Sequence, residues 1–204
     1  INDFDAVVVS PGWRPNHPLI EAALRSNCEI LNEVDLAWQI RSEIAPHQKW
    51  LALTGTNGKT TTVEMTAKIL KTAGLKAVAC GNVGDTVMDA VDRTEPYEYL
   101  VLELSSFQLH WAKQAQFVSA AILNIADDHT DWHGDFENFA GLNRDTDVQP
   151  APGPLLGNSK HSNCHQQGDP QHIQRDREGH QSLRRYLRHH KHDAASDQHV
   201  AAVV

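Results

Sequence analysis

The sequence predicts an α/β protein in which a mostly parallel sheet is flanked by helices. Short apolar runs rich in β-branched residues alternate with longer segments of helical spacing. Glycines and polar residues follow the apolar runs, as at the carboxyl ends of parallel strands. Strands that alternate with helices imply right-handed crossovers, which bring successive strands into parallel pairing.

The elements expected in the first part of the chain are two strands and two helices. The strand at 6–9 ends at the turn Ser10-Pro11-Gly12, and a second strand covers 28–31. The helix at 17–26 has helical spacing at Leu19, Ala22, Ala23 and the stem of Arg25. In the helix at 33–44 we expect Val34, Leu36, Ala37 and Ile40 to face inward.

Four further strands and two helices follow residue 48. A strand at 49–53 leads through a glycine-containing loop into a helix at 58–73, which Gly74 ends. The strands at 76–80, 99–103 and 118–124 are near-continuously apolar, which is typical of strands buried on both faces. A short helix is expected at 108–113 between the last two strands.

Composition excludes several classes of protein. The net charge of −8 argues against a bulk nucleic-acid surface, so no nucleic-acid partner is expected. The three cysteines are widely spaced without a motif, which indicates a reducing, cytoplasmic setting. No apolar stretch approaches the roughly 20 residues that span a bilayer, and no signal peptide opens the chain, so no membrane association is expected.

The composition changes abruptly near residue 142. All five Trp and all five Phe precede this point, whereas Tyr186 is the only aromatic residue after it. Such a segment buries too little apolar area to offset the entropy of ordering, so 142–204 is interpreted as a disordered tail. A short helix at 182–190 is the one element we consider there.

Polar side chains stand at the ends of five expected strands, where a parallel sheet gathers its ligands. We therefore expect them to converge on one edge. They are Ser10; residues 54–60; Gly81 and Asn82; Glu103, Ser105 and Ser106; and residues 124–129, which include Asp127, Asp128 and His129.

The loop TGTNGKTT at 54–61 lies between a strand and a helix and predicts a phosphate site. Its backbone N–H groups and the positive end of the helix dipole attract anions, and Lys59 adds an ammonium for the β- and γ-phosphates. Thr60 is placed to offer a hydroxyl to Mg²⁺. Leu53 stands where the common phosphate-loop pattern has its first glycine, so the prediction depends on the strand–loop–helix context. The alternative is an ordinary helix start capped by a threonine.

Two residues at other strand ends could hold a metal ion. Glu103 ends a buried strand, and a metal ion is one partner that offsets the desolvation of its carboxylate; an ion pair with a lysine is the alternative. His129 is a candidate second ligand, although a single histidine is more often structural or merely exposed. Asn82 is a candidate substrate contact or simply a turn asparagine.

These motifs, in this order and spacing, resemble the central domain of the Mur ligases. The residues that carry the resemblance are TGTNGKTT, GNVG, LELSSFQL and ILNIADDHTDWHG, and the opening VVVSPGWRPNHPLIEAALRSNCEIL is similar to the end of the family's UDP-binding domain. The stretch ELSSFQL resembles the members that join D-glutamate to UDP-N-acetylmuramoyl-L-alanine. The resemblance covers about residues 5–141.

The resemblance implies a cytoplasmic, monomeric ligase that uses ATP and Mg²⁺ in peptidoglycan synthesis. Its small-molecule substrates would be UDP-N-acetylmuramoyl-L-alanine and D-glutamate, joined through an acyl phosphate. The implied catalytic residues are Lys59, Glu103 and His129. The implied ATP-binding residues are Gly55, Thr56, Asn57, Gly58, Lys59, Thr60 and Thr61. The implied metal ligands are Thr60, Glu103 and His129, and the implied substrate contacts are Ser10, Asn82 and Ser105.

The sequence also departs from the family pattern. Residues 1–46 correspond to the end of the UDP-binding domain and 47–141 to an incomplete ATP-binding domain; the uridine-binding loop expected before Ile1 is absent. A helix carrying a carbamylated lysine is expected near residue 141, where Gly141-Leu142-Asn143-Arg144 stands instead, and 145–204 shows no counterpart of the C-terminal domain. We hypothesise that 142–204 is translated out of frame; a natural histidine-rich metal-binding tail is the alternative.

Because of these departures, the chain is expected to have little or no ligase activity. Two other functions stay open from the sequence. One is a nucleotide-binding module without ligase chemistry. The other is a relative of folylpolyglutamate synthase, against which ELSSFQL argues.

Overall fold

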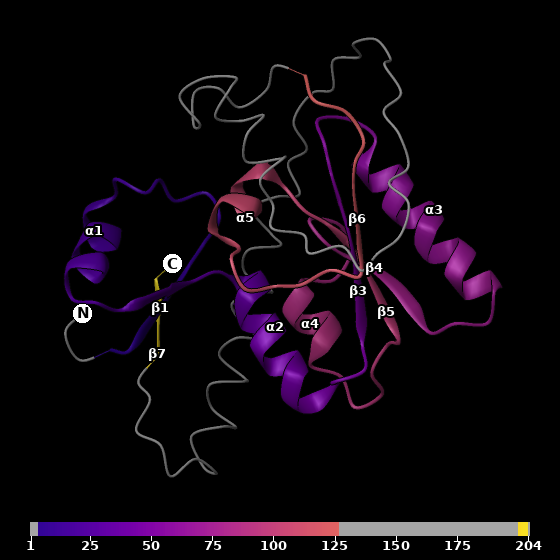
Figure 1. Cartoon of the computed structure of the whole chain (residues 1–204), viewed down its shortest axis with the longest axis horizontal. Coiled ribbons are helices and arrows are strands. Elements are labelled where there is room, and N and C mark those ends of the chain that lie inside the picture. The colour runs from indigo at the N-terminus through magenta and orange to yellow at the C-terminus, as the bar shows by residue number, and fades with distance from the viewer. Residues whose placement is uncertain (1–3, 127–199, 204) are drawn as a thin grey trace.

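The computed structural model describes residues 4–126 and 200–203, and these form two parallel sheets with helices around them (Figure 1). One sheet has three strands in the order β2-β1-β7, and the other has four in the order β4-β5-β3-β6. Every strand pair is parallel, so the predicted α/β class with a parallel sheet is confirmed. The strands are β1 (Ala6–Val9), β2 (Glu29–Leu31), β3 (Lys49–Thr54), β4 (Ala77–Gly81), β5 (Tyr99–Glu103), β6 (Ser119–Ile122) and β7 (Val200–Val203). The helices are α1 (Pro18–Arg25), α2 (Glu33–Ile44), α3 (Lys59–Thr72), α4 (Val87–Val91) and α5 (Ser106–Trp111).

Three elements differ from the expectation. Helix α4 is absent from the sequence-based assignment, because four of its five residues are buried and a five-residue apolar helix shows no readable period. Helix α5 begins two residues earlier than expected, since Ser105 and Gln108 form a capping box at its start. Strand β7 falls in the predicted tail and pairs with β1, Ala6 opposite Val200. The rest of the tail, including the helix considered at 182–190, lies outside the described residues.

One face of the first sheet packs on α1 and on one residue of α5, and the other face packs on α2. Strand β1 is buried along its whole length, and Val7 and Val9 contact Ile20, Ala23 and Trp111 in one apolar cluster. The apolar face predicted for α1 is wrong in detail, because Ile20 is fully buried whereas Leu19 is 44% exposed. Ile20 and Ala23, three positions apart, form the face of α1 that packs on β1.

The second sheet has α3 on one side and α2 and α4 on the other (Figure 1). Its edge strand β6 is exposed at Ser119 and Ala121, so the burial predicted for the strand at 118–124 is wrong. Leu100 and Leu102 of β5 face α2 and α4, and Val101 faces α3. The near-continuous apolar sequence of β5 is explained by this burial on both sides. The inward residues predicted for α2 are confirmed as buried: Val34, Leu36, Ala37 and Ile40.

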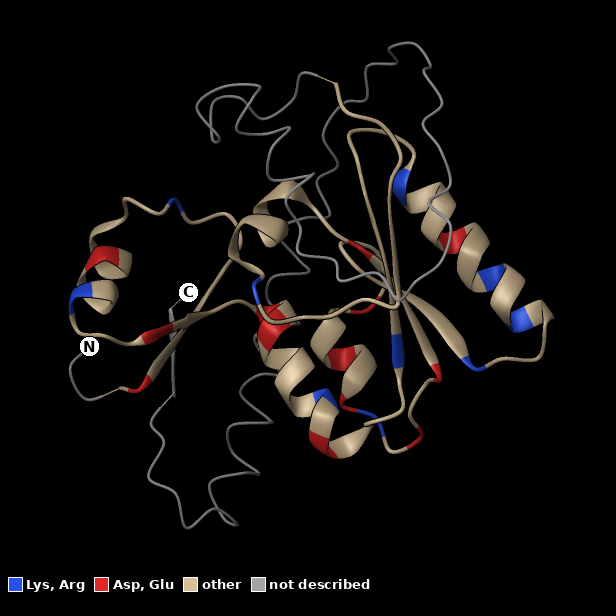
Figure 2. Cartoon of the chain, viewed as in Figure 1, with Lys and Arg blue, Asp and Glu red and all other residues tan. Residues whose placement is uncertain are grey.

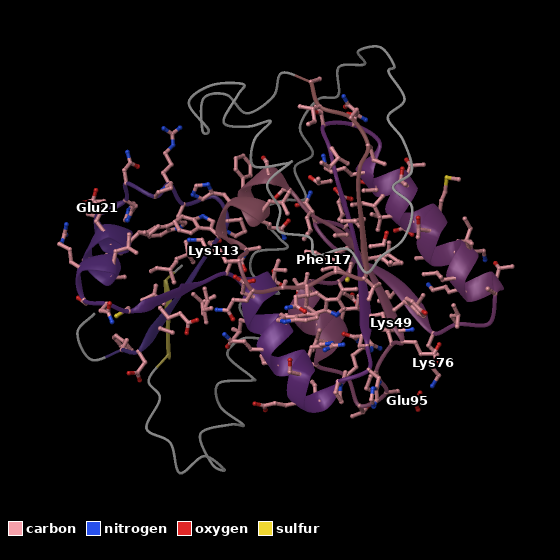
Figure 3. All side chains as sticks on the ribbon, in the orientation of Figure 1. Glu21, Lys49, Lys76, Glu95, Lys113 and Phe117 are labelled. Carbon is pink, nitrogen blue, oxygen red and sulfur yellow. The ribbon has the colours of Figure 1, made fainter. Side chains whose placement is uncertain are left out.

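The surface of the described residues carries charges of both signs. Figure 2 shows acidic and basic residues interspersed along α1, α2 and α3. Lys49, Lys76 and Glu95 lie near the amino ends of β3 and β4 (Figure 3), and Lys76 pairs with Glu95 at 3.9 Å. In the described part of the chain, no helix is long and apolar enough to cross a membrane.

Candidate phosphate and metal site

The loop between β3 and α3 turns on two glycines. Gly58 is the N-cap of α3 with a φ of 81°, and Gly55 has a φ of 136°, values that side-chain-bearing residues rarely adopt. A Cβ at Gly55 would also lie 2.9 Å from the backbone oxygen of Asn124, closer than real contacts allow. Glycine at position 55 is therefore required both by the backbone conformation and by the neighbouring segment.

The amino end of α3 is a favourable place for an anion. Its N-cap is Gly58, which offers no side-chain cap, and its first turn contains no acidic residue. The alternative of a threonine-capped helix start is therefore wrong. The N–H groups of the first turn have no intrahelical acceptors, and the helix dipole makes this end positive.

The ammonium of Lys59 lies over the same loop. Its Nζ donates to the backbone oxygens of Gly55 at 2.7 Å and Thr56 at 3.0 Å. These contacts hold the charge beside the amino end of α3 instead of letting it extend into solvent. A phosphate at this helix end would meet both the positive charge and the backbone donors.

Glu103 connects three strands at the carboxyl edge of the second sheet. Its side chain is 3% exposed, and its Oε2 accepts a hydrogen bond from Thr60 Oγ1 at 2.8 Å. Its Oε1 accepts from Asn82 Nδ2 at 3.1 Å. Strand β5 lies between β3 and β4, so three residues predicted from separate strand ends meet in one hydrogen-bonded group.

Gly81 allows Asn82 to reach Glu103. Its φ is 98°, and a Cβ there would lie 2.6 Å from the backbone oxygen of Glu103. The Asn82 N–H donates to that same oxygen at 2.9 Å. The backbone and the side chain of Asn82 thus both bind Glu103.

The donor set fits a hard divalent cation. A carboxylate and a hydroxyl are the oxygen ligands that Mg²⁺ prefers, and Mg²⁺ commonly retains several waters beside one or two protein ligands. Within 4–126, no group of three or more His, Cys, Asp or Glu side chains could hold a metal ion by itself. The described part of the chain therefore offers Thr60 and Glu103, while His129, Asp127 and Asp128 lie outside the described residues.

Of the predicted substrate contacts, Ser10 is placed differently from the expectation, whereas Ser105 lies at the expected strand end and also caps a helix. Ser10 follows β1 and so belongs to the edge of the other sheet, because the five strand ends are divided between two sheets. Ser105 lies two residues after Glu103, but its hydroxyl accepts from Gln108 N at 3.2 Å and donates to Gln108 Oε1 at 3.0 Å as the cap of α5. The common edge expected for all five strand ends is thus wrong for Ser10.

Cys80 precedes Gly81 but is not a nucleophile candidate. Its side chain is fully buried, and desolvation raises the pKa of the thiol, with the charges of Glu33 and Asp85 acting in the same direction. A protonated, buried thiol has little reactivity.

Asn124, for which the sequence predicted no separate role, lies against the loop 55–58 between β3 and α3, here called the phosphate loop. Its side chain binds both backbone groups of Asn57, each at 2.8 Å. The signal that the sequence carries is its position directly after an apolar strand, which many turn asparagines share.

Comparison with known proteins agrees with this geometry. A family model described as the Mur ligase middle domain matches residues 53–143. The UDP-N-acetylmuramoylalanine–D-glutamate ligase of Streptomyces coelicolor is 49% identical over 140 residues, which are 67% of this chain and 29% of that protein. The ligase of the same name from Thermobifida fusca is 50% identical over 138 residues, again 67% and 29%.

Among solved structures, a UDP-N-acetylmuramate:L-alanyl-γ-D-glutamyl-meso-diaminopimelate ligase from Neisseria meningitides superimposes with a TM-score of 0.47 at 18% identity. The superposition covers 97% of this chain and 58% of the Neisseria ligase. A structural likeness of this extent adds no argument about function. The chain spans about 29% of the length of the curated relatives it matches. The family match contains the phosphate loop and also Asn82 and Glu103. The chain belongs to the Mur ligase family.

Proposed function

We propose that this chain is part of an ATP-dependent ligase that joins D-glutamate to UDP-N-acetylmuramoyl-L-alanine in peptidoglycan synthesis. The observation that carries the proposal is that Thr60 and Asn82 both hydrogen-bond to Glu103. This group lies beside the phosphate loop and Lys59. The matched relatives from Streptomyces coelicolor and Thermobifida fusca bear the name of this ligase, at about half of the aligned residues identical. Their names favour this ligase activity over that of a folylpolyglutamate synthase.

The proposed reaction has two steps. The carboxylate of UDP-N-acetylmuramoyl-L-alanine attacks the γ-phosphorus of ATP, forming an acyl phosphate as the bond to ADP breaks. The amine of D-glutamate then attacks the acyl carbon, the amide bond forms, and inorganic phosphate leaves. Both steps bring negative groups together, so catalysis depends on positive charge and on orientation.

The side chains have distinct roles in this proposal. Lys59 and the backbone N–H groups at the start of α3 bind the β- and γ-phosphates, with 55–61 as the ATP-binding segment. Thr60, Glu103 and His129 would hold Mg²⁺, which when bound neutralises phosphate charge. Asn82, Ser105 and Ser10 are proposed to contact the UDP-linked substrate.

The wider setting is also a proposal. We place the protein in the cytoplasm, where the UDP-linked precursor and ATP are both found, as a monomer that needs neither nucleic acid nor membrane. The assigned segments are 1–46 for the end of the UDP-binding domain and 47–141 for the ATP-binding domain.

Residues 142–204 are proposed to be read out of frame. The family match ends at residue 143, next to the change in composition. Sequencing the coding DNA tests this: a base insertion or deletion near codon 141, relative to genes of the matched relatives, supports the frameshift. An uninterrupted native frame through Gly141 and Leu142 contradicts it.

A second candidate function is nucleotide binding without ligase turnover. The loop contacts of Lys59, which this candidate requires, lie within the described part of the chain. Phosphate release with ATP, UDP-N-acetylmuramoyl-L-alanine and D-glutamate separates the two: turnover identifies a ligase, and ATP binding without turnover identifies a module.

The test of the phosphate site is MgATP binding measured by titration calorimetry. We expect Lys59→Ala to weaken binding by at least roughly tenfold, because it removes the ammonium that the loop carbonyls hold beside the helix end. Lys68→Ala is the matched control, since Lys68 is an exposed lysine on the same helix. Equal affinities for the parent and Lys59→Ala would refute the site.

A further inference from the structure

The segment 123–126 continues the pairing of β3 and β6 beyond the ends of both strands. The N–H of Leu123 donates to the backbone oxygen of Thr54 at 3.0 Å, and the N–H of Thr56 donates to that of Asn124 at 3.0 Å. The phosphate loop is therefore attached along one side to a segment that lies far along the chain, with Asn57 and Asn124 separated by 67 positions.

The carboxamide of Asn124 extends this pairing to Asn57, in place of a backbone peptide group. Its Oδ1 accepts from the Asn57 N–H, and its Nδ2 donates to the Asn57 backbone oxygen, both at 2.8 Å. This two-bond pairing fixes the orientation of the peptide groups on either side of Asn57. An aliphatic side chain at position 124 cannot provide it.

The hydroxyl of Thr56 makes the reciprocal connection. It accepts from the N–H of Ala126 at 2.9 Å and lies 3.3 Å from the Ala126 backbone oxygen, to which it donates. Each of the two segments thus contributes one side chain that binds the backbone of the other.

These contacts decide which groups of the loop face a ligand. The N–H groups of Thr56 and Asn57 are both committed to Asn124. Phosphate oxygens must therefore bind farther along, at the first turn of α3. The carbonyls of Gly55 and Thr56, held by the same arrangement, are the ones that receive the Lys59 ammonium.

We infer that Asn124 and Thr56 are positioning residues that shape the phosphate loop for a nucleoside triphosphate without contacting it. This inference rests on the proposed nucleotide site and revises its details, since Thr56 and Asn57 hold the loop and the first turn of α3 with Lys59 holds the phosphates. Gly55 fits the same role, because any side chain there would push Asn124 away.

The test is a double-mutant cycle in MgATP affinity, measured on the whole chain. Asn124→Ala removes two hydrogen bonds to the loop and is expected to weaken MgATP binding roughly tenfold. In the Lys59→Ala background the same change is expected to have almost no further effect, because Asn124 acts through the placement of the lysine and its loop. Fully additive losses would overturn the inference, as would an Asn124→Ala variant that binds like the parent.

A second pair of variants covers the case in which Asn124→Ala does not fold. Thr56→Val keeps the shape of the side chain but loses the hydroxyl, so it is expected to weaken binding severalfold. Thr56→Ser restores the hydroxyl and is expected to recover most of that loss. Equal affinities for the valine and serine variants would count against the inference.

Gln39→Ala serves as the control for loss of a carboxamide. The Gln39 side chain bonds to Gln114 at 2.8 Å on an exposed surface formed by other elements, so its removal should leave affinity unchanged. A parent chain that binds no MgATP, with all variants folded, would instead refute the proposed nucleotide site. Failure of the nucleotide site is distinguishable from failure of the positioning inference, because it is seen in the parent chain without any substitution.

Discussion

The Thr60 hydroxyl, on the first turn of α3, donates to the Glu103 carboxylate, at the end of β5, across 2.8 Å. The two residues are 43 positions apart in the chain, and the parallel pairing of β3 with β5 brings them together. A hydroxyl and a buried carboxylate in contact are hard oxygen donors of the kind that Mg²⁺ prefers, and they lie beside the loop that we propose binds phosphate.

We predict that Glu103→Gln removes the Mg²⁺ dependence of nucleotide binding. The amide keeps the shape of the side chain but loses the negative charge that a divalent cation requires. ATP affinity in excess EDTA should change less than about twofold, whereas affinity in Mg²⁺ should fall about tenfold. Titrations with and without Mg²⁺ measure both, and an unchanged response to Mg²⁺ in the variant would contradict the metal role of Glu103.

A methyl group at Gly81 should disrupt the same site through the backbone. The positive φ and the approach of 2.6 Å to the Glu103 oxygen together predict a loss of about 2–4 kcal/mol in the free energy of unfolding. Gly74→Ala is a matched control, because Gly74 also has a positive φ of 83°, but a Cβ at that position would meet nothing within 4 Å. It should cost only about 1 kcal/mol. Urea unfolding measures both losses, and equal values would show that the contact with Glu103 is unimportant.

The buried carboxylate of Asp35 should be a major contributor to stability. It is 1% exposed and accepts the N–H groups of Lys113 at 2.8 Å, Gln114 at 2.9 Å and Ala115 at 3.0 Å. These bonds tie α2 to the segment that follows α5, where Figure 3 labels Lys113. Asp35→Ala leaves three donors without their acceptor, so unfolding free energy should fall by about 3 kcal/mol.

Glu21→Ala is the comparison for that prediction. Glu21 pairs with Arg25 at 3.5 Å on the exposed surface of α1, so its loss should cost under about 0.5 kcal/mol. Similar losses for the two acidic residues would show that the hydrogen bonds to Asp35 contribute little.

Glu33 should make stability depend on pH. Burial raises the pKa of its carboxyl, and the nearby charge of Asp89 acts in the same direction, while hydrogen bonds from the backbone of Met88 and Val87 oppose the shift. A raised pKa means that the folded state binds the proton more tightly than the unfolded chain. The resulting stability is complete below the ordinary glutamate pKa of 4.5 and is lost as pH rises through the folded-state value.

Glu33→Gln tests this dependence. Glutamine keeps an acceptor for the Met88 N–H, at 3.0 Å in the parent, and removes the charge. The variant should be more stable than the parent at pH 8, and the difference should shrink toward pH 4. Chemical denaturation at several pH values measures it, and a difference independent of pH would refute the assignment to Glu33.

Most of the strands and helices, although not α4 or β7, were readable from local signals. The β-branched run of β1, the apolar run of β5 and the glycine after α3 each reflect a property of a few adjacent residues. The five-residue α4 carried no such signal. The inward face of α1 was misjudged because its packing on β1, through Ile20 and Ala23, decides which face is buried.

The sequence by itself determined an alternating α/β chain with a lysine loop and polar residues at the strand ends. Strand composition, glycine placement and side-chain periodicity are local properties. They can be read from the sequence without knowing which segments pack together. Only the tertiary structure decided the order β4-β5-β3-β6, which sets Glu103 between Thr60 and Asn82, and the separation of Ser10 into another sheet. It also decided the pairing of Asn124 with Asn57. Strand neighbours are chosen by burial of both faces of β5 over long separations in the chain, and no local pattern encodes that choice.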